Sequence, residues 1–205
     1  MATFEPMPST QSDSASRTVV AAVRVEREME RALSPARRTH VLGVAEYAMA
    51  LARRFGEDPE RARLAALGHD IAREWDDAAV QRLAFSDGFP VSELERRQPK
   101  VLHGRAAAVI LRETFHVCDE EVLAAVRTHT LGDVGMTRLQ KLLYCADYLE
   151  TGRPYIEPEF RARVERLGLD EMLCACVEHN YRRGHEPADR TLAMYSETCG
   201  KEFPA

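Results

Sequence analysis

The stretch Leu67-Gly68-His69-Asp70-Ile71-Ala72 is the most informative part of this sequence. It places an imidazole beside a carboxylate in an apolar run, where an ionisable group costs free energy unless a partner satisfies it. Four further residues of these two types lie at the starts or ends of predicted helices, in apolar surroundings: His40, His103, His129 and Asp147. Imidazole nitrogens and carboxylate oxygens together suit zinc, iron or manganese. We therefore predict that one shared metal site satisfies all six side chains.

Each of these residues taken alone has a less specific interpretation. A single histidine on a helix is usually a surface residue or a hydrogen-bonded core residue, and one His-Asp pair arises readily by chance. His116, His179 and His185 have no carboxylate in a comparable setting, so we leave them outside the site. The combination favours a shared site, because six residues of the right types occur in order, the last within a Cys-Ala-Asp-Tyr context.

Helical periodicity extends from this stretch in both directions. Ser34-Pro35 offers a cap and a first-turn proline, and Gly56 a C-terminal stop. The predicted helices cover approximately residues 17–33, 35–55, 58–74, 76–85, 102–115, 119–129, 137–150, 158–167, 169–183 and 188–197, with a turn, a short charged helical segment and a breaking proline at 86–99. We find no alternating stretch long enough to predict a strand. The fold class is therefore all-α.

Length and composition indicate one globular domain. The chain has 205 residues, and residues 1–16 are rich in Ser, Thr, Pro and Gln, which predicts a disordered tail before a single domain at 17–205. The net charge of −5 gives no support for nucleic-acid or membrane-surface binding. No run approaches 18 apolar residues, and the start does not resemble a secretory signal. We expect a cytoplasmic protein.

The five cysteines do not suggest a disulfide framework. Their number is odd, no CxxC pair occurs, and Cys174 and Cys176 lie two apart on a predicted helix, so they point in different directions. We interpret all five as reduced, buried thiols.

The motifs resemble the HD superfamily of metal-dependent phosphohydrolases. They resemble more closely its YqeK-type branch, the symmetrical diadenosine tetraphosphate hydrolases. The resemblance rests on His40-Val41-Leu42-Gly43-Val44-Ala45, Leu67-Gly68-His69-Asp70, Leu102-His103-Gly104, Arg127-Thr128-His129-Thr130-Leu131-Gly132 and Ala146-Asp147-Tyr148-Leu149-Glu150. It spans about residues 34–195. The His-Gly, Arg-x-His-Thr and Ala-Asp-Tyr-x-Glu elements are the ones that point to the branch.

This resemblance implies a fold and a reaction. The fold would be an HD-domain helical bundle with the metal site between its helices. Two divalent metal ions, iron most of all but also manganese or zinc, would share Asp70 as a bridging and catalytic residue. His40, His69 and Asp147 would complete the first ion's ligands, and His103 and His129 would bind the second. Metal-bound hydroxide would then attack an inner phosphorus of diadenosine tetraphosphate and yield two ADP.

A tetraphosphate needs positive charge beyond the metals. Arg73, Lys141 and Arg153 lie within a few residues of motif positions and are the candidate phosphate contacts, with solvated surface charge as the alternative for each. Arg73 is also a candidate catalytic residue, although the family often has lysine there. Arg105 stands where the family usually has an apolar residue or proline.

Other functions are compatible with the same ligand set. One is a phosphohydrolase acting on another nucleotide, such as a nucleoside monophosphate or a guanosine alarmone. Another is a di-iron oxygenase of the HD type, and a third is a non-catalytic metal or nucleotide sensor. In each case we expect a small-molecule partner rather than nucleic acid or membrane, and leave a homodimer open.

Overall fold

The computed structural model describes residues 10–204, and these residues form helices without any strand. The helices are α1 (Thr10–Ala32), α2 (Pro35–Phe55), α3 (Pro59–Gly68), α4 (Asp77–Phe85), α5 (Glu93–Arg97), the 3-10 helix η1 (Pro99–Leu102), α6 (His103–Glu113), α7 (Glu120–Thr128), α8 (Arg138–Leu149), α9 (Pro158–Val164), α10 (Leu169–Arg182) and α11 (Asp189–Cys199). The all-α prediction is confirmed. None of the helices within this described range has the length and apolar character needed to span a membrane.

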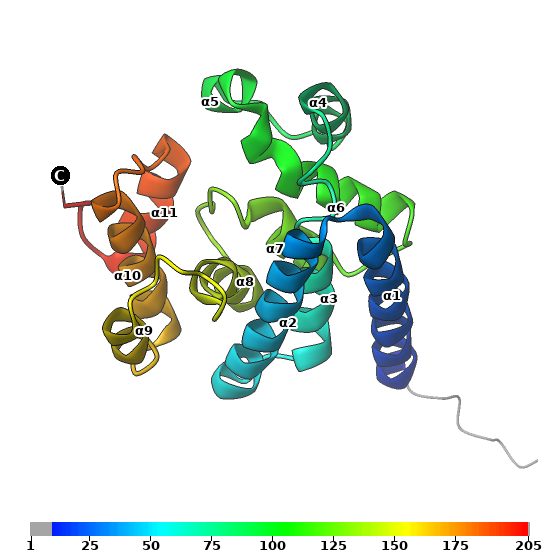
Figure 1. The fold of residues 1–205 in the computed structure, drawn as a ribbon, viewed down its shortest axis with the longest axis horizontal. Coiled ribbons are helices and arrows are strands. Elements are labelled where there is room, and N and C mark those ends of the chain that lie inside the picture. The colour runs from blue at the N-terminus through cyan, green and yellow to red at the C-terminus, as the bar shows by residue number, and fades with distance from the viewer. Residues whose placement is uncertain (1–9, 205) are drawn as a thin grey trace, which may run out of the picture.

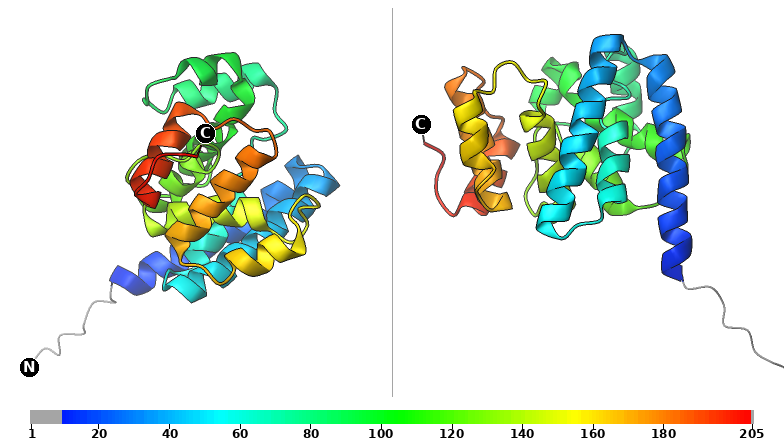
Figure 2. Two further views of the ribbon diagram at one scale, coloured as in Figure 1. Left: turned by 90° about the vertical axis from the view of Figure 1, so that its left-hand side faces the viewer. Right: turned by 60° about the horizontal axis from the view of Figure 1, so that its bottom comes forward.

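Four helices form the centre of the molecule. Helix α2 packs on α3 and α8, and α7 packs on α3, α6 and α8 (Figure 1). Helix α1 covers α3 at one end, and α10 joins α9 and α11 to α8 at the other end, as the two further views also show (Figure 2). Helices α4 and α5 lie beside η1 at the start of α6.

Helix boundaries follow from local capping. The Ser34 hydroxyl accepts a first-turn N–H of α2, with Pro35 as the first helical residue. Asp58 and Asp119 cap α3 and α7 in the same way, each accepting two backbone N–H groups. Thr137 and the third helical residue of α8 form a reciprocal capping box. The predicted starts of these four helices agree with the structure because each carries a capping residue.

Helix α3 ends earlier than the apolar spacing predicts. It stops at Gly68 rather than near Glu74, and the chain continues through successive turns in which Ile71 N–H bonds to Gly68 O and Arg73 N–H to Asp70 O. Ile71 is nevertheless 2% exposed, so the turns keep the apolar residue inside. The periodicity therefore continues past the point where the α-helix ends, and the sequence alone does not reveal the change.

The first helix begins earlier than expected. Residues 10–16, which the composition assigned to a disordered tail, belong to α1, and residues 1–9 lie outside the described part of the chain. Once the packed part of α1 is formed, each added residue contributes one backbone hydrogen bond at little cost. Polar composition alone therefore does not show where a helix begins.

The expectation of five reduced thiols was wrong for two cysteines. Cys174 on α10 and Cys199 on α11 form a disulfide across 25 residues of sequence. Cys145 and Cys176 are buried free thiols, whereas Cys118 is exposed. Cys174 and Cys176 do point in different directions, but the partner of Cys174 comes from another helix. Only the packing of α11 against α10 brings that partner close.

Candidate metal centre

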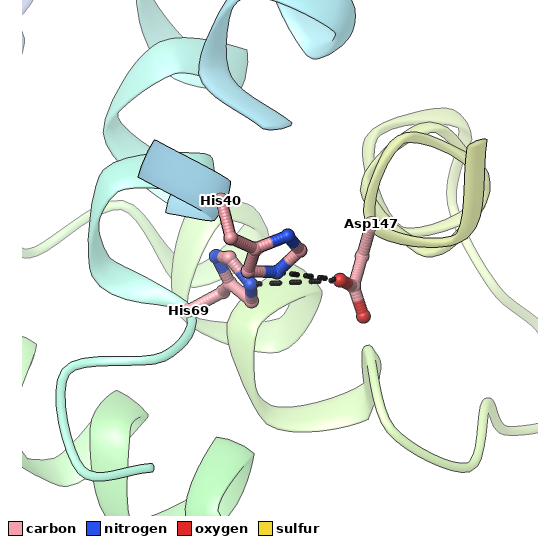
Figure 3. Close-up of side chains that lie close together, drawn as sticks. All are labelled: His40, His69 and Asp147. Atoms are coloured by element: carbon pink, nitrogen blue, oxygen red, sulfur yellow. Dashed lines mark ion pairs between the residues drawn. The ribbon is translucent and has the colours of Figure 1, made fainter. Parts of the chain in front are cut away.

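The structure brings all six predicted ligands to one place. His40 lies in the second turn of α2, His69 and Asp70 directly follow α3, and His129 directly follows α7. The other two come from helices as well: His103 is the first residue of α6 and Asp147 is near the end of α8. The imidazoles of His40 and His69 both point toward the carboxylate of Asp147 (Figure 3). Helix ends thus carry most of the site.

One half of the cluster combines two imidazoles with two carboxylates. Asp147 Oδ1 lies 3.1 Å from His40 Nε2 and 3.8 Å from His69 Nε2. Asp70 Oδ2 lies 3.7 Å from His40 Nε2 and 3.5 Å from His69 Nε2. Each of the two carboxylates therefore lies within 4 Å of both imidazole nitrogens.

The other half uses the second oxygen of Asp70. Asp70 Oδ1 lies 2.9 Å from His103 Nε2 and 3.9 Å from His129 Nε2. The Nε2 atoms of His103 and His129 are 3.0 Å apart. A Cβ on Gly104 would lie 2.8 Å from both His129 Nδ1 and Val126 O. Glycine at this position therefore lets α6 approach α7 closely enough to bring the two imidazoles together.

Backbone carbonyls determine which ring nitrogens face the centre. Nδ1 of His69, His103 and His129 lies 2.6–2.7 Å from the carbonyl oxygen three residues earlier in each case. A carbonyl oxygen only accepts, so each Nδ1 carries the hydrogen and each Nε2 presents a lone pair. The lone pairs of His103 and His129 therefore face one another across 3.0 Å. A cation between them would relieve that repulsion.

An unpartnered buried nitrogen is consistent with this interpretation. Within the described range, no group hydrogen-bonds to Nε2 of His69, a residue that is fully buried. Buried polar atoms are rarely left unpaired. A divalent cation would satisfy this nitrogen and the surrounding carboxylates together, so the donor set fits a metal of the kind that imidazole and carboxylate bind.

Burial keeps two of the imidazoles neutral. It lowers the pKa of His69, and together with the neighbouring His103 it lowers the pKa of His129 to about 3. Burial acts to raise the pKa of Asp70, yet the imidazoles of His69, His103 and His129 hold that pKa well below its usual range. The cluster therefore offers His69 and His129 as neutral imidazoles and Asp70 as an ionised carboxylate at neutral pH, the forms that bind metals.

A cavity of about 410 Å³ opens over the cluster. Its walls combine metal-ligand candidates with five basic side chains, Arg37, Lys100, Arg73, Arg153 and Arg183, and three aromatic ones, Tyr144, Tyr148 and Tyr155. Local positive charge is therefore concentrated here although the whole chain carries −5. Such a wall suits a polyanion bearing aromatic groups.

Two of the three predicted phosphate contacts line this cavity, and one does not. Arg73 and Arg153 are part of its wall, and Arg153 Nη2 lies 2.5 Å from Asp147 Oδ1. Lys141 instead pairs with Asp170 at 2.8 Å and borders a separate surface hollow. Six residues of helix separate Lys141 from Asp147, about 9 Å along the axis. Lys141 therefore lies outside the wall of this cavity.

Sequence reasoning missed several cavity residues. Arg37 Nη1 donates to Asp70 Oδ2 at 2.7 Å, and its position three residues before His40 on α2 was a usable signal. Arg183, whose guanidinium lies 3.7 Å from the ring centroid of Tyr155, follows α10 and carries no local signal. Only the packing of α10 against α8 brings it to the cavity.

The chain matches the HD domain family over residues 37–152. It is 34% identical over 147 residues to a symmetrical bis(5'-nucleosyl)-tetraphosphatase of Bacillus subtilis (strain 168), a match covering 72% of this chain and 78% of that protein. A protein of the same name from Halalkalibacterium halodurans is 34% identical over 60% of this chain and 65% of its own length.

A solved structure has a similar fold. The crystal structure of a predicted HD superfamily hydrolase involved in NAD metabolism from Clostridium acetobutylicum superimposes with a TM-score of 0.76 at 26% identity. The match covers 86% of this chain and 96% of that one. The similarity thus extends over nearly the whole helical fold, beyond the segment that carries the histidines.

Proposed function

This chain belongs to the HD domain family, and we propose that it is a metal-dependent hydrolase that cleaves diadenosine tetraphosphate symmetrically to two ADP. The names and the 34% identity of two relatives support this substrate. The cluster of imidazoles and carboxylates supports dependence on a divalent metal. The basic and aromatic cavity wall supports a polyphosphate that carries nucleobases.

The position of Asp70 is the observation that carries the proposal. Its Oδ2 faces His40 and His69, whereas its Oδ1 lies 2.9 Å from His103 Nε2. A carboxylate with its two oxygens directed at two sets of ligands is what a bridge between two ions requires. We therefore propose two ions that share Asp70. The preference for iron rests on the resemblance of the motifs to the HD superfamily.

Divalent ions bound here would activate a water molecule near neutral pH and offset the charge that develops on the attacked phosphoryl group. Arg73, Arg153 and Arg37 would hold the phosphate chain in the cavity, because a guanidinium can bind two phosphoryl oxygens at once. Tyr148 and Tyr155 would pack against the nucleosides at its rim. Water adds to an inner phosphorus, ADP leaves, and the second product is also ADP.

Two further parts of the interpretation rest on the sequence alone. A cytoplasmic location stays a prediction, and a homodimer is left open. The reaction does not require a dimer, because all six proposed metal ligands belong to one chain.

Product analysis tests the proposed reaction. Anaerobically purified, metal-loaded protein is incubated with diadenosine tetraphosphate in oxygen-18 water, and the nucleotides are separated and weighed by mass spectrometry. We expect ADP as the sole product, with one labelled oxygen on the terminal phosphate of one of each pair of ADP molecules. Formation of ATP plus AMP would reject symmetrical cleavage.

Three further assays separate this reaction from the alternative functions. A panel of nucleoside monophosphates and guanosine alarmones, scored by product, identifies a hydrolase with another substrate. Oxygen consumption with an organic substrate would favour an oxygenase, whereas phosphate-ester cleavage under anaerobic conditions opposes it. Tight nucleotide binding without turnover in a fully metallated sample would indicate a sensor.

A further inference from the structure

The four imidazoles of the cluster are held in two different ways. His69, His103 and His129 each donate Nδ1–H to a backbone carbonyl three residues earlier, at helix ends where carbonyls lack a helical partner. His40 lies inside α2, where the preceding carbonyls already accept backbone N–H groups of the next turn. Its Nδ1 therefore needs an acceptor from outside its own helix.

Glu150 supplies that acceptor. Its Oε1 lies 3.2 Å from His40 Nδ1, and the residue is 4% exposed. Helix α8 ends at Leu149, directly before Glu150, and carries Asp147 three positions before Glu150, with Oδ1 at 3.1 Å from His40 Nε2. The end of α8 thus contacts both nitrogens of one imidazole, one from the metal side and one from the opposite side.

The Glu150 carboxylate is itself held in place. Gly152 N–H donates to its Oε2 at 2.5 Å. On the α2 side, a Cβ on Gly43 would lie 2.7 Å from the same Oε2, so the carboxylate occupies space that only glycine leaves open. A backbone hydrogen bond from Gly152 and the close approach of α2 at Gly43 therefore restrict the orientation of this buried carboxylate.

We propose that Glu150 is a positioning residue that orients His40 for metal binding. Its carboxylate accepts Nδ1–H of His40, which fixes the tautomer whose Nε2 lone pair points into the cluster. A carboxylate behind a ligating histidine also raises the basicity of the ring. This inference rests on the metal centre proposed above, because it concerns one of that centre's ligands.

Metal affinity is the direct test. Mn²⁺ is titrated into the metal-free full-length protein, and free Mn²⁺ is measured by electron paramagnetic resonance. Glu150→Ala should weaken Mn²⁺ binding by about 10- to 100-fold, the usual effect of removing such a partner. Glu150→Gln should lose less, because its amide oxygen can accept one of the two N–H groups that Glu150 accepts from His40 and Gly152.

A second variant approaches the same carboxylate from the other side. Gly43→Ala keeps Glu150 but forces its Oε2 to move, since the added methyl would lie 2.7 Å away. It should weaken Mn²⁺ binding in the same direction as Glu150→Ala. Because only the end of a flexible side chain has to move, the fold should be retained, which circular dichroism checks.

Two controls define what a failure would mean. Glu178→Ala removes a carboxylate on α10 that accepts from Tyr195 and Lys201 away from the cavity, so it should leave Mn²⁺ affinity unchanged. Asp147→Ala removes a proposed direct ligand. Wild-type affinity in Asp147→Ala would overturn the metal centre itself, whereas loss in Asp147→Ala with wild-type affinity in Glu150→Ala would overturn only the role of Glu150.

A spectroscopic readout separates positioning from general stability. In the zinc-loaded protein, proton–nitrogen correlation spectra of the imidazoles should show a slowly exchanging proton on Nδ1 of His40, assigned by its absence in His40→Gln. Glu150→Ala should lose this slow exchange, while the corresponding protons of His69 and His129 stay. An unchanged His40 signal in Glu150→Ala would overturn the proposal.

Discussion

Asp70 connects the two halves of the histidine cluster. Each of its carboxylate oxygens faces a different pair of imidazoles, and the residue is 3% exposed. At the residue scale, this geometry depends on the turns that follow α3. In these turns His69 and Asp70, which are adjacent in sequence, both face the cluster. The assignment of metal ligands stays a prediction that metal analysis must test.

Arg73 lies in the turns that follow α3 and not on the helix itself. Residues three apart share a face on a helix, but Asp70 and Arg73 both lie past the end of α3, where Arg73 N–H bonds to Asp70 O at 2.9 Å. The side chain still lines the cavity. We predict that Arg73→Ala lowers kcat/KM about ten- to a hundredfold, the effect of losing roughly 1.5–3 kcal/mol of charged hydrogen bonding.

The kinetic pattern assigns the role of Arg73. A lowered kcat would mean that its contact strengthens in the transition state, whereas a raised KM alone would mean uniform binding. Arg73→Lys should recover part of the loss, with metal content unchanged. Lys141→Ala is the matched control, because Lys141 pairs with Asp170 outside the cavity, and it should be kinetically silent. Wild-type kinetics in Arg73→Ala would make Arg73 an ordinary surface charge.

The six proposed ligands could be predicted from sequence because each is costly where it stands. A histidine or aspartate in an apolar helical stretch needs a partner. One shared metal site would provide that partner for all six side chains. Arg37 and Arg183 carry no comparable cost, because an arginine at a helix end is normally solvated. The spacing of Arg37 from His40 was a usable signal, whereas the role of Arg183 becomes visible only when packing places it against Tyr155.

At the scale of elements, helix starts were easier to predict than helix ends. Capping serines, threonines and aspartates specify where α2, α3, α7 and α8 begin, since side chain and backbone satisfy each other locally. The end of α3 depends on turns that keep Ile71 buried and aim His69 and Asp70 at the cluster. That requirement is tertiary, so spacing does not reveal it.

Arg105 joins α6 to the segment that contains α4, α5 and η1. Its guanidinium bonds to Asp87 at 2.6 and 2.8 Å and to Glu95 at 3.1 Å, and all three side chains are at most 7% exposed. We predict that Arg105→Ala lowers the free energy of unfolding by about 3–5 kcal/mol, because two carboxylates lose their buried partner. Urea denaturation measures this loss.

Arg112 provides a matched control on the same helix. It binds Glu120 through two bonds of 2.8 Å, but both side chains are more than half exposed. Arg112→Ala should therefore cost only about 0–1 kcal/mol. Equal losses in the two arginine variants would contradict the distinction between a buried and an exposed ion pair.

At the scale of the whole molecule, the C-terminal helices complete the cavity. Tyr155 before α9, Asn180 on α10 and Arg183 after it line the cavity. Helices α9 and α10 lie at the end of the molecule opposite α1 (Figure 1), and the disulfide between Cys174 and Cys199 ties α10 to α11. No local pattern in the sequence joins these segments to the histidines. The family resemblance includes these segments, but only the packing of the helices shows that they line the cavity.

The disulfide gives a prediction for the intact molecule. Unfolded, non-reduced protein should contain three reactive thiols, and Cys174→Ala/Cys199→Ala should lose roughly 3–4 kcal/mol of unfolding free energy, as expected for a closed loop of 25 residues. Metal content should be unchanged, because neither cysteine lies in the cluster. Five reactive thiols would instead support the original expectation that all cysteines are reduced.

Metal content tests the central claim most directly. Wild-type, His103→Ala and Asp70→Ala proteins are purified anaerobically, loaded with Fe²⁺, desalted and analysed by mass spectrometry of the metals. The two-sided geometry of Asp70 predicts about two ions per chain in the wild type, loss mainly of the second ion in His103→Ala, and none in Asp70→Ala. An Asp70→Ala protein that retained the full metal content and full hydrolytic activity would contradict the proposed centre.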